Sequence, residues 1–533
     1  MARFANSGDS DAAVQVEDDK TMDDMQGTPA LQDLVSTRRS DRVARKVTLG
    51  AYMAIAASAF GLISDGYHNN LMTMTNVVFK KLYPTEYTSN VSTRVSNAML
   101  VGEVIGQVFV GILCDRHGRK SGLVMTTLLI IVGAILCTVA HGAHGGAQSL
   151  FWFMTIARGV TGVGAGGEYP ASSTSASEGA NETSIEKRGP VFIMVTDLPL
   201  VCGGPLAVSV FLIVLSAAGQ AHLETIWRVC FGVGIALPMT VFYFRMRMLN
   251  SKLYREGAIR RRVPYWLSLK RYWKALIGTG GSCIRFLFDF IFYPNGIFSA
   301  SIISSVIKDG DVKATAEWQL LLGAIAIPGA CKIDDVECRR NTMILGFSGY
   351  VIFGLIIGIG YDKVTRIVPL FIVLYGLMTS MSNLGPGNMT LLTSAESYPT
   401  PIRGTFFGLS AALGKAGAAV GTEVFTPIQD NLGKRCEMFT HTFAMRILMD
   451  SSLTRRWTFI VAAIFGALGI LVTYLFVPDM TGIDLALEDT RFLRYLAENG
   501  WDGDVGIAGD TGPLGTEEVK SGSSKGYDDE EVA

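Results

Sequence analysis

Residues 111–120 read Gly-Ile-Leu-Cys-Asp-Arg-His-Gly-Arg-Lys and form a charged turn between two apolar stretches, 95–114 and 121–141. Each stretch has about the 20 mostly apolar residues that a membrane-spanning helix needs. One aspartate and three Lys or Arg residues in so short a turn predict a charge latch between helices, which must break when the two halves of the protein rock. The alternative is an ordinary basic loop on the cytoplasmic side of the membrane.

These two stretches belong to a set of twelve, six on either side of a basic segment. Hydrophobic residues make up 49% of the 533 residues and charged residues 17%, whereas a soluble chain carries about 25% charge. We therefore predict an all-α polytopic membrane protein whose twelve transmembrane helices form two six-helix bundles. The stretches are 47–68, 95–114, 121–141, 150–171, 190–216 and 226–247, followed by 277–306, 315–330, 342–361, 367–395, 404–427 and 457–477.

Lys and Arg residues set the predicted orientation, because short cytoplasmic loops carry an excess of them. They gather before the first stretch, in the turn at 116–120, and in segment 245–274, which has ten Lys or Arg and one Glu. All three places lie on one side if the helices alternate, so both termini are expected in the cytoplasm. The predicted division is a disordered cytoplasmic N-terminal tail 1–46, an N-terminal bundle 47–247, a basic cytoplasmic loop 248–274, a C-terminal bundle 275–477 and a cytoplasmic C-terminal tail 478–533.

An acidic side chain lies in the fourth stretch, after a run of glycines. Residues 158–170 read Arg-Gly-Val-Thr-Gly-Val-Gly-Ala-Gly-Gly-Glu-Tyr-Pro, so Glu168 and Tyr169 stand where another helix can approach closely. A carboxylate in such a place is partly desolvated and suits proton exchange. The alternative is a structural network in which Arg158 pairs with Glu168.

The seventh stretch carries Arg285, Asp289 and Tyr293 at positions i, i+4 and i+8, which drift only modestly around one helical face. An arginine suits a phosphate because its planar fork donates hydrogen bonds in pairs. Asp289 can carry a proton and Tyr293 can donate a hydrogen bond. The alternative is an internal salt bridge between Arg285 and Asp289 that only holds the helix together.

Further polar residues at membrane depth complete the set of candidates. Lys415 lies in a helix of Gly and Ala and is expected to neutralise an anion or pair with Asp289, with a structural role as the alternative. Asp65 in the first stretch is a further carboxylate at membrane depth. Glu103 in the second stretch receives no assigned role, and Asn388 follows Gly-Pro-Gly as a further polar candidate.

Several chemistries are excluded. The eight cysteines are scattered without metal-type spacing, so no metal and no cofactor is expected. Because we find no HxxxxD, GxSxG, HExxH or DDxxD arrangement near a membrane face, no catalytic residue is expected and the chain is predicted not to be an enzyme. No nucleic-acid partner is expected either.

The turn at 111–120 resembles the G-x-L-x-D-R-x-G-R-K loop of the major facilitator superfamily, and residues 396–404, Glu-Ser-Tyr-Pro-Thr-Pro-Ile-Arg-Gly, resemble its second-half loop. Residues 162–170 are similar to the G-x-G-x-G-G-[DE]-Y-P pattern of the phosphate:proton symporter branch, which more often has Asp at this Glu. In that branch Asp289 and Tyr293 match substrate-contacting positions, whereas Trp is usual at the position of Arg285, and Asn388 is one residue out of register. The candidates are therefore Tyr169, Arg285, Asp289, Tyr293, Asn388 and Lys415 for substrate binding, Asp65, Glu168 and Asp289 for proton coupling, and Asp115, Arg116, Arg119, Glu396 and Arg403 for the latch.

Longer stretches resemble the fungal glycerophosphoinositol and glycerophosphodiester permeases over about residues 47–505, among them GLISDGY at 61–67 and PNGIFSASIISSVIKD at 294–309. The resemblance implies a monomeric, proton-coupled symporter in the bilayer of the plasma membrane. It would import glycerophosphoinositol or glycerophosphocholine, small organic phosphates, by alternating access. Inorganic phosphate as the substrate, and a receptor that binds without transport, are the alternatives.

Two segments depart from that family. The eighth stretch, 315–330, has 16 residues, which as a helix would reach about 24 Å against a bilayer core of about 30 Å. A truncated eighth helix is therefore expected, and 331–340 after it lacks most of the family's second charged turn. Segment 436–455 separates Asn-Leu-Gly from Arg-Trp-Thr-Phe, which follow each other directly in the family. Errors in the gene model or real divergence explain both segments.

Overall fold

The computed structural model describes residues 49–183, 188–247, 259, 264–279, 282–307, 310–331, 339–430, 451–477 and 485–501. The chain divides into two units, residues 1–49 and 50–533, and the second contains nearly all the described residues. The predicted N-terminal tail 1–46 lies outside the described residues.

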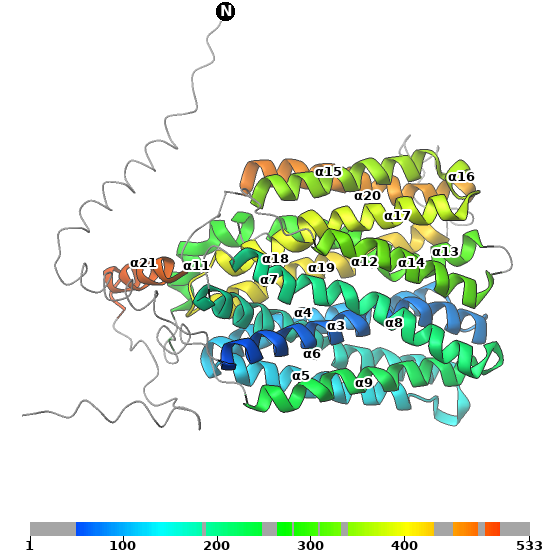
Figure 1. The fold of residues 1–533 in the computed structure, drawn as a ribbon, viewed down its shortest axis with the longest axis horizontal. Coiled ribbons are helices and arrows are strands. Elements are labelled where there is room, and N and C mark those ends of the chain that lie inside the picture. The colour runs from blue at the N-terminus through cyan, green and yellow to red at the C-terminus, as the bar shows by residue number, and fades with distance from the viewer. Residues whose placement is uncertain are drawn as a thin grey trace, which may run out of the picture. The chain divides into compact units, whose positions relative to one another are not determined.

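The first half of the second unit consists of long helices, which Figure 1 draws in blue to green. One of them is interrupted at Thr196, between α7 and α8, where the backbone departs from regular helix. The helices are α3 (Leu49–Leu82), α4 (Ser89–His117), α5 (Arg119–Val139), α6 (Ala147–Thr183), α7 (Arg188–Val195), α8 (Asp197–Ala218) and α9 (Leu223–Arg247).

The second half repeats this pattern, with two interrupted helices. The first breaks at Phe298, between α12 and α13, and the second passes through a π-helical turn, η5 (Asn383–Gly387), that contains Pro386. The helices are α12 (Ser282–Ile297), α13 (Ser299–Val306), α14 (Val312–Cys331), α15 (Arg339–Ile359), α16 (Tyr361–Val364), α17 (Val368–Ser382), α18 (Asn388–Glu396), α19 (Arg403–Asp430) and α20 (Ser451–Phe476).

The number of membrane-length helices agrees with the sequence. Eight spans in the described part of the chain are long and apolar enough to cross a membrane. Four further helices, α3, α6, α14 and α19, have 20 to 37 residues and pack among them, which gives twelve for the described residues. The all-α prediction is therefore confirmed.

The expected truncation of the eighth helix is wrong. Helix α14 has 20 residues, about 30 Å at 1.5 Å per residue, which matches the bilayer core. It begins three residues before the apolar stretch, at Val312, which is buried. The atypical segments fall mostly outside the described residues, at 332–338 and 431–450.

Glycines let the helices approach closely at two places that matter for the site. Between α4 and α6, a Cβ on Gly166 would collide with the carbonyl oxygen of Glu103. Between α4 and α19, a Cβ on Gly408 would collide with the carbonyl oxygen of Gln107. Small residues allow such backbone contact in membrane proteins. Helix α4 therefore contacts both a helix of its own half and α19 of the other half.

Besides the four-residue α16, two described helices lie outside the twelve spans, at the end of the molecule where α4 meets α5 (Figure 1). Helix α11 (Tyr265–Lys274) precedes α12 and is followed by a π-helical turn, η3 (Ala275–Thr279). Helix α21 (Leu485–Glu498) lies within the segment predicted to be a C-terminal tail. That tail is therefore helical in part, because Phe492 and Leu496 find a buried apolar partner in Tyr272 of α11.

Candidate functional site

A cavity of about 180 Å³ lies between the two halves. Its wall combines residues of α3, α6 and α8 from the first half with residues of α12, α14, α17, η5, α18 and α19 from the second. All three interrupted helices contribute near their breaks, as Asp197, Ser299 and Asn383 illustrate. Broken helices are tolerated at membrane depth where they line a cavity. The polar lining residues include Asn69, Asn70, Thr73, Asp197, Asn295, Gln319 and Asn383.

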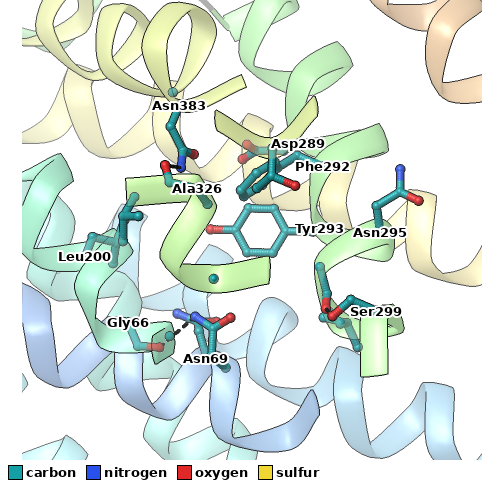
Figure 2. A pocket seen from close by; sticks show the side chains of 18 of the residues that line it. Gly66, Asn69, Leu200, Asp289, Phe292, Tyr293, Asn295, Ser299, Ala326 and Asn383 are labelled. Carbon is teal, nitrogen blue, oxygen red and sulfur yellow. Dashed lines mark hydrogen bonds between the residues drawn. The ribbon is translucent and has the colours of Figure 1, made fainter. Parts of the chain in front are cut away.

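The predicted triad of α12 lines this cavity. Figure 2 shows Asp289 and Tyr293 projecting into it, with Asn69 of α3 facing them from the other half. Arg285 is only 5% exposed, and its Nη1 atom has no hydrogen-bond partner among the described residues. No ion pair within 4 Å joins Arg285 to Asp289 in that part of the chain. The arginine fork is therefore left with donor capacity at the wall of the cavity.

Lys415 of α19 also lines the cavity, but its acidic partner differs from the one expected. Its Nζ atom lies 2.8 Å from Oε2 of Glu103 on α4, so the ion pair joins the two halves. The same ammonium group donates to the hydroxyl of Tyr293 and lies 5.1 Å from the ring centroid of Tyr169. The expected ion pair with Asp289 does not occur among the described residues. Glu103, which received no role from the sequence, thus holds the lysine in place.

Glu168 lies outside the wall of the cavity. It forms a buried ion pair with Arg245 of α9 and accepts hydrogen bonds from Thr126 and Ser172, so it joins α5, α6 and α9. Arg158, the expected partner, donates instead to the carbonyl oxygen of Val95. Glu168 therefore lies in a structural network, as the alternative interpretation expected, but its arginine partner is Arg245.

Asp65 and Asn388 are both buried and both absent from the wall of the cavity. Neither carboxylate oxygen of Asp65 has a hydrogen-bond partner in the described part of the chain. Asn388 donates to the carbonyl oxygen of Gly329 at 3.4 Å. The cavity is lined instead by Asn383, one and a half turns earlier, which donates to the carbonyl oxygen of Ala326.

The predicted latch is a buried network at the junction of α4 and α5. Arg119 lies 2.6 Å from Asp115 and 2.8 Å from Glu178 of α6. Glu178 is also 3.3 Å from Arg403 of α19, which carries the network into the second half. All four residues are at most 1% exposed, so their mutual interaction is little screened by water.

Asp115 has a second role in this network, at the first turn of α19. Its Oδ1 atom accepts the backbone N–H of Gly404 at 2.9 Å, and its Oδ2 atom accepts the N–H of Thr405 at 2.6 Å. The first N–H groups of a helix have no partner inside the helix, and a carboxylate there is favoured by the helix dipole. An acid of the first half thus caps a helix of the second half.

The remaining latch residues lie elsewhere. Glu396 accepts hydrogen bonds from Arg339, at the start of α15, at 2.9 and 3.0 Å. This ion pair lies inside the second half and is separate from the network around Asp115. Arg116 is exposed, and its guanidinium carbon lies 5.6 Å from the ring centroid of Tyr265. The five predicted latch residues therefore divide among three places.

Helix α21 is bonded to the loop that carries the latch. Its Asp489 accepts the backbone N–H of Thr400 at 2.6 Å and the hydroxyl of Thr400 at 2.7 Å. The carbonyl oxygen of Thr400 accepts in turn from Arg119, at 3.0 Å. Burial raises the pKa of Asp489, while Arg403 and the bonds from Thr400 oppose the rise. Helix α21 is therefore connected to the latch through Thr400, which bonds to both Asp489 and Arg119.

Several residues of the cavity and of these networks are missing from the sequence-based candidates, and three of them have a signal in the sequence. Glu178 lies beyond residue 171, the predicted end of the fourth stretch, yet the Ser- and Ala-rich residues between them contain no helix breaker. Asp197 is an acid inside the fifth stretch, by the same criterion that selects Asp65. Arg339 is the remnant of a charged turn, but its partner could not be inferred.

Two halves of membrane-spanning helices around a shared cavity, closed at one end by a charge network, define a transporter of the major facilitator type. The chain belongs to the family described as sugar (and other) transporter, whose model matches residues 50–492. It is 48% identical to glycerophosphoinositol permease 1 of Candida albicans, over 93% of this chain and 91% of that protein. It is 47% identical to glycerophosphoinositol transporter 1 of Saccharomyces cerevisiae, over 85% and 84%.

Solved structures agree on the fold. The xylose transporter XylE, in a structure described as a proton:xylose symporter with a bound sugar analogue, superimposes with a TM-score of 0.63, at 15% identity, over 84% of this chain and 100% of that one. Identity this low supports a common fold alone. The predicted major facilitator fold is confirmed, and so is the resemblance to the glycerophosphoinositol permeases. Phosphate transporters are more distant relatives. One of Lotus japonicus is 27% identical over 69% of this chain and 81% of that protein.

Proposed function

We propose that the chain imports a glycerophosphodiester, with glycerophosphoinositol as the first candidate, together with a proton. The six helices of each half would move as a body and expose the cavity to the two sides of the membrane in turn. The latch end would face the cytoplasm, with both termini on that side, in the plasma membrane and as a monomer. The names of relatives that are 47 and 48% identical to this chain support the choice of substrate.

The observation that carries the proposal is the buried Arg285 with an unpartnered Nη1 atom at the wall of the cavity. A buried donor without a partner costs free energy, about 1–3 kcal/mol or more when it is charged. A phosphodiester supplies two non-bridging oxygens that share one negative charge and match the guanidinium fork. Lys415 stands in the same wall, so a phosphate would meet two cations, one of them already paired with Glu103.

The rest of the lining suits a polyol arm. Asn69, Asn70 and Gln319 present amides that both donate and accept hydrogen bonds, which is what a ring of hydroxyl groups requires. Inorganic phosphate has no such arm and would leave these amides to water. The lining therefore favours a phosphodiester with a hydroxylated head group over inorganic phosphate.

Asp289 is the proposed proton carrier, with Asp65 as a second acid at membrane depth. Protonation of a carboxylate beside the bound anion lowers the charge that crosses the low-dielectric centre, which couples the two fluxes. Glu168, held by Arg245, is proposed to hold helices together rather than to carry the proton.

Uptake of labelled glycerophosphoinositol by purified protein in vesicles tests the proposal. We expect uptake driven by an inward proton gradient, competed by glycerophosphoinositol more strongly than by glycerophosphocholine or phosphate. Asp289→Asn is expected to abolish the dependence on the gradient while the protein still inserts into the vesicles. Gradient-driven uptake that persists in this variant refutes the coupling role. Binding of the labelled compound without any uptake would indicate a receptor, and stronger competition by phosphate than by unlabelled glycerophosphoinositol would indicate a phosphate carrier.

A further inference from the structure

Helix α11 has two apolar faces, and only one is used inside the protein. The inner face buries Ser268, Tyr272 and Leu276, and Tyr272 packs against Phe492 of α21. The hydroxyl of Tyr272 donates to Glu488 at 2.6 Å. These contacts fix how α11 is rotated about its axis, and therefore which residues point outward.

The outer face carries Trp266, Leu269 and Trp273 of α11 and continues with Ile277 of η3, at a spacing of three, four and four residues. This spacing places them on one side of a helix. Trp266 is 77% exposed, Trp273 49% and Ile277 50%, so the described part of the chain leaves the stripe largely uncovered. Contiguous exposed apolar side chains with a polar rim are typical of interaction sites.

The rim of this stripe is basic. Lys270 and Lys274 are exposed, and no ion pair holds either of them among the described residues. Arg271, between them, is oriented toward α21, with its guanidinium carbon 5.0 Å from the ring centroid of Tyr495. Two lysines beside an apolar stripe complement a surface that is anionic above and apolar below.

The stripe also continues into the membrane-facing surface. Helix α11 passes through η3, which contains Ile277, and the membrane-length span begins at Cys283. Eight residues thus separate Lys274 from that span, which keeps the end of α11 near the head groups. Trp residues concentrate at this level of a bilayer, and amphipathic helices with Trp, Leu and Lys lie in it.

We propose that the outer face of α11, defined by Trp266, Leu269, Trp273 and Ile277 with Lys270 and Lys274, docks on the bilayer surface and prefers anionic phospholipids there. The apolar side chains enter the boundary of the acyl chains, and the two lysines contact phosphate and carboxylate groups of the lipids. The basic rim and the continuity with α12 single out lipid as the occupant, rather than a second copy of the chain.

Tryptophan fluorescence of the full-length protein in vesicles tests this docking. The fluorescence of the Trp266→Phe/Trp273→Phe variant is subtracted from that of the unaltered protein. The difference signal comes from these two of the seven tryptophans. Vesicles contain phosphatidylcholine and phosphatidylserine, with bromine on the acyl chains of one lipid or the other. We expect quenching of the difference signal in both cases, and stronger quenching per lipid by brominated phosphatidylserine.

Charge variants test the lipid preference separately from the docking. Lys270→Gln/Lys274→Gln is expected to lower the preference for phosphatidylserine by roughly five-fold for each lysine, and Lys270→Arg/Lys274→Arg is expected to retain it. Lys313→Gln/Lys363→Gln removes the same charge from α14 and α16, near the opposite end of the helices in Figure 1, and should leave the preference unchanged.

Three results would overturn the proposal. A difference signal that bromine does not quench, but iodide in the buffer does, places the stripe in water. A signal that neither quenches places it under another protein chain. Equal quenching by the two brominated lipids, unchanged in the Lys270→Gln/Lys274→Gln variant, removes the anionic preference.

Discussion

At the latch, Asp115 accepts two backbone N–H groups and an arginine, and Glu178 bridges two arginines of different halves. At the cavity, Arg285 and Asp197 are also buried, yet neither has an ion-pair partner within 4 Å in the described part of the chain, whereas each latch charge has at least one. Buried polar groups in folded proteins are nearly always bonded, so an exception calls for an explanation. The comparison suggests that the latch charges hold two bodies together, and that the cavity charges are satisfied by a visiting molecule.

The largest effect is expected from removing the shared acid of the latch. Glu178→Gln leaves Arg119 and Arg403 buried without a common counter-charge, which should lower the free energy of unfolding by about 3–5 kcal/mol. The matched control is Glu224→Gln, which breaks the exposed pair with Arg228 and should cost no more than about 1 kcal/mol. Denaturation in mixed micelles measures both, and equal losses would mean that the latch adds nothing to stability.

A second pair of substitutions separates a charge that serves a ligand from one that serves the fold. Arg285→Gln should weaken substrate binding on the order of 100-fold, because an ionic hydrogen-bonded contact of about 2–3 kcal/mol is lost. The stability of the Arg285→Gln variant should change little. Arg245→Gln, in contrast, should destabilise the protein by about 3–5 kcal/mol, because it leaves Glu168 as a buried charge without its arginine.

Substrate titration and denaturation of the same two preparations measure this pair. Arg285→Lys, which keeps the charge but loses the fork, should fall between the unaltered protein and Arg285→Gln in affinity. An Arg285→Gln variant that binds normally but unfolds easily would reverse the assignment, and Arg285 would belong with the latch charges.

Lys415 and Glu103 combine features of the latch and of the cavity. They form an ion pair with each other, and Lys415 also lines the cavity. A double-mutant cycle with Lys415→Met and Glu103→Gln should give an interaction free energy of about 1–3 kcal/mol, because both partners are buried and in contact. Either single variant should be less stable than the double variant. Additive losses would mean that the two groups do not interact in solution.

The smallest effect is expected at the edge of the latch. Asp489→Asn keeps one acceptor for Thr400 but loses the charge, which should cost about 1 kcal/mol. Hydrogen exchange should then rise at the backbone N–H of Thr400, whereas Glu498→Gln on the exposed side of α21 should leave it unchanged. Unaltered exchange in the first variant would separate α21 from the latch.

The sequence was sufficient for the fold because its evidence is local: stretch length, apolar composition and a charged turn each depend on neighbouring residues. It was also sufficient for placing Arg285, Asp289 and Tyr293 at one cavity, since all three share a helix face. Their roles in binding and coupling stay predictions.

Pairing across helices was not predictable in the same way. Which acid meets Lys415 depends on the depth and rotation of α4 against α19, and these are set by glycine contacts distributed along both helices. The same holds for Arg245, which stands beside Glu168 in place of Arg158. Asn388 was placed at the cavity by its neighbourhood in sequence, but the π-helical turn before it rotates Asn383 toward the cavity instead.

Helix α19 has a mechanical consequence of its own. Its first turn is held by Asp115, and Lys415 lies 11 residues further along the same uninterrupted helix, about 16 Å away at 1.5 Å per residue. Because α19 is uninterrupted, a tilt of the helix moves both of these places together. A movement of the whole helix that draws Lys415 toward an anion would therefore also displace Gly404 and Thr405 relative to the carboxylate of Asp115, so that substrate binding and opening of the latch would be coupled.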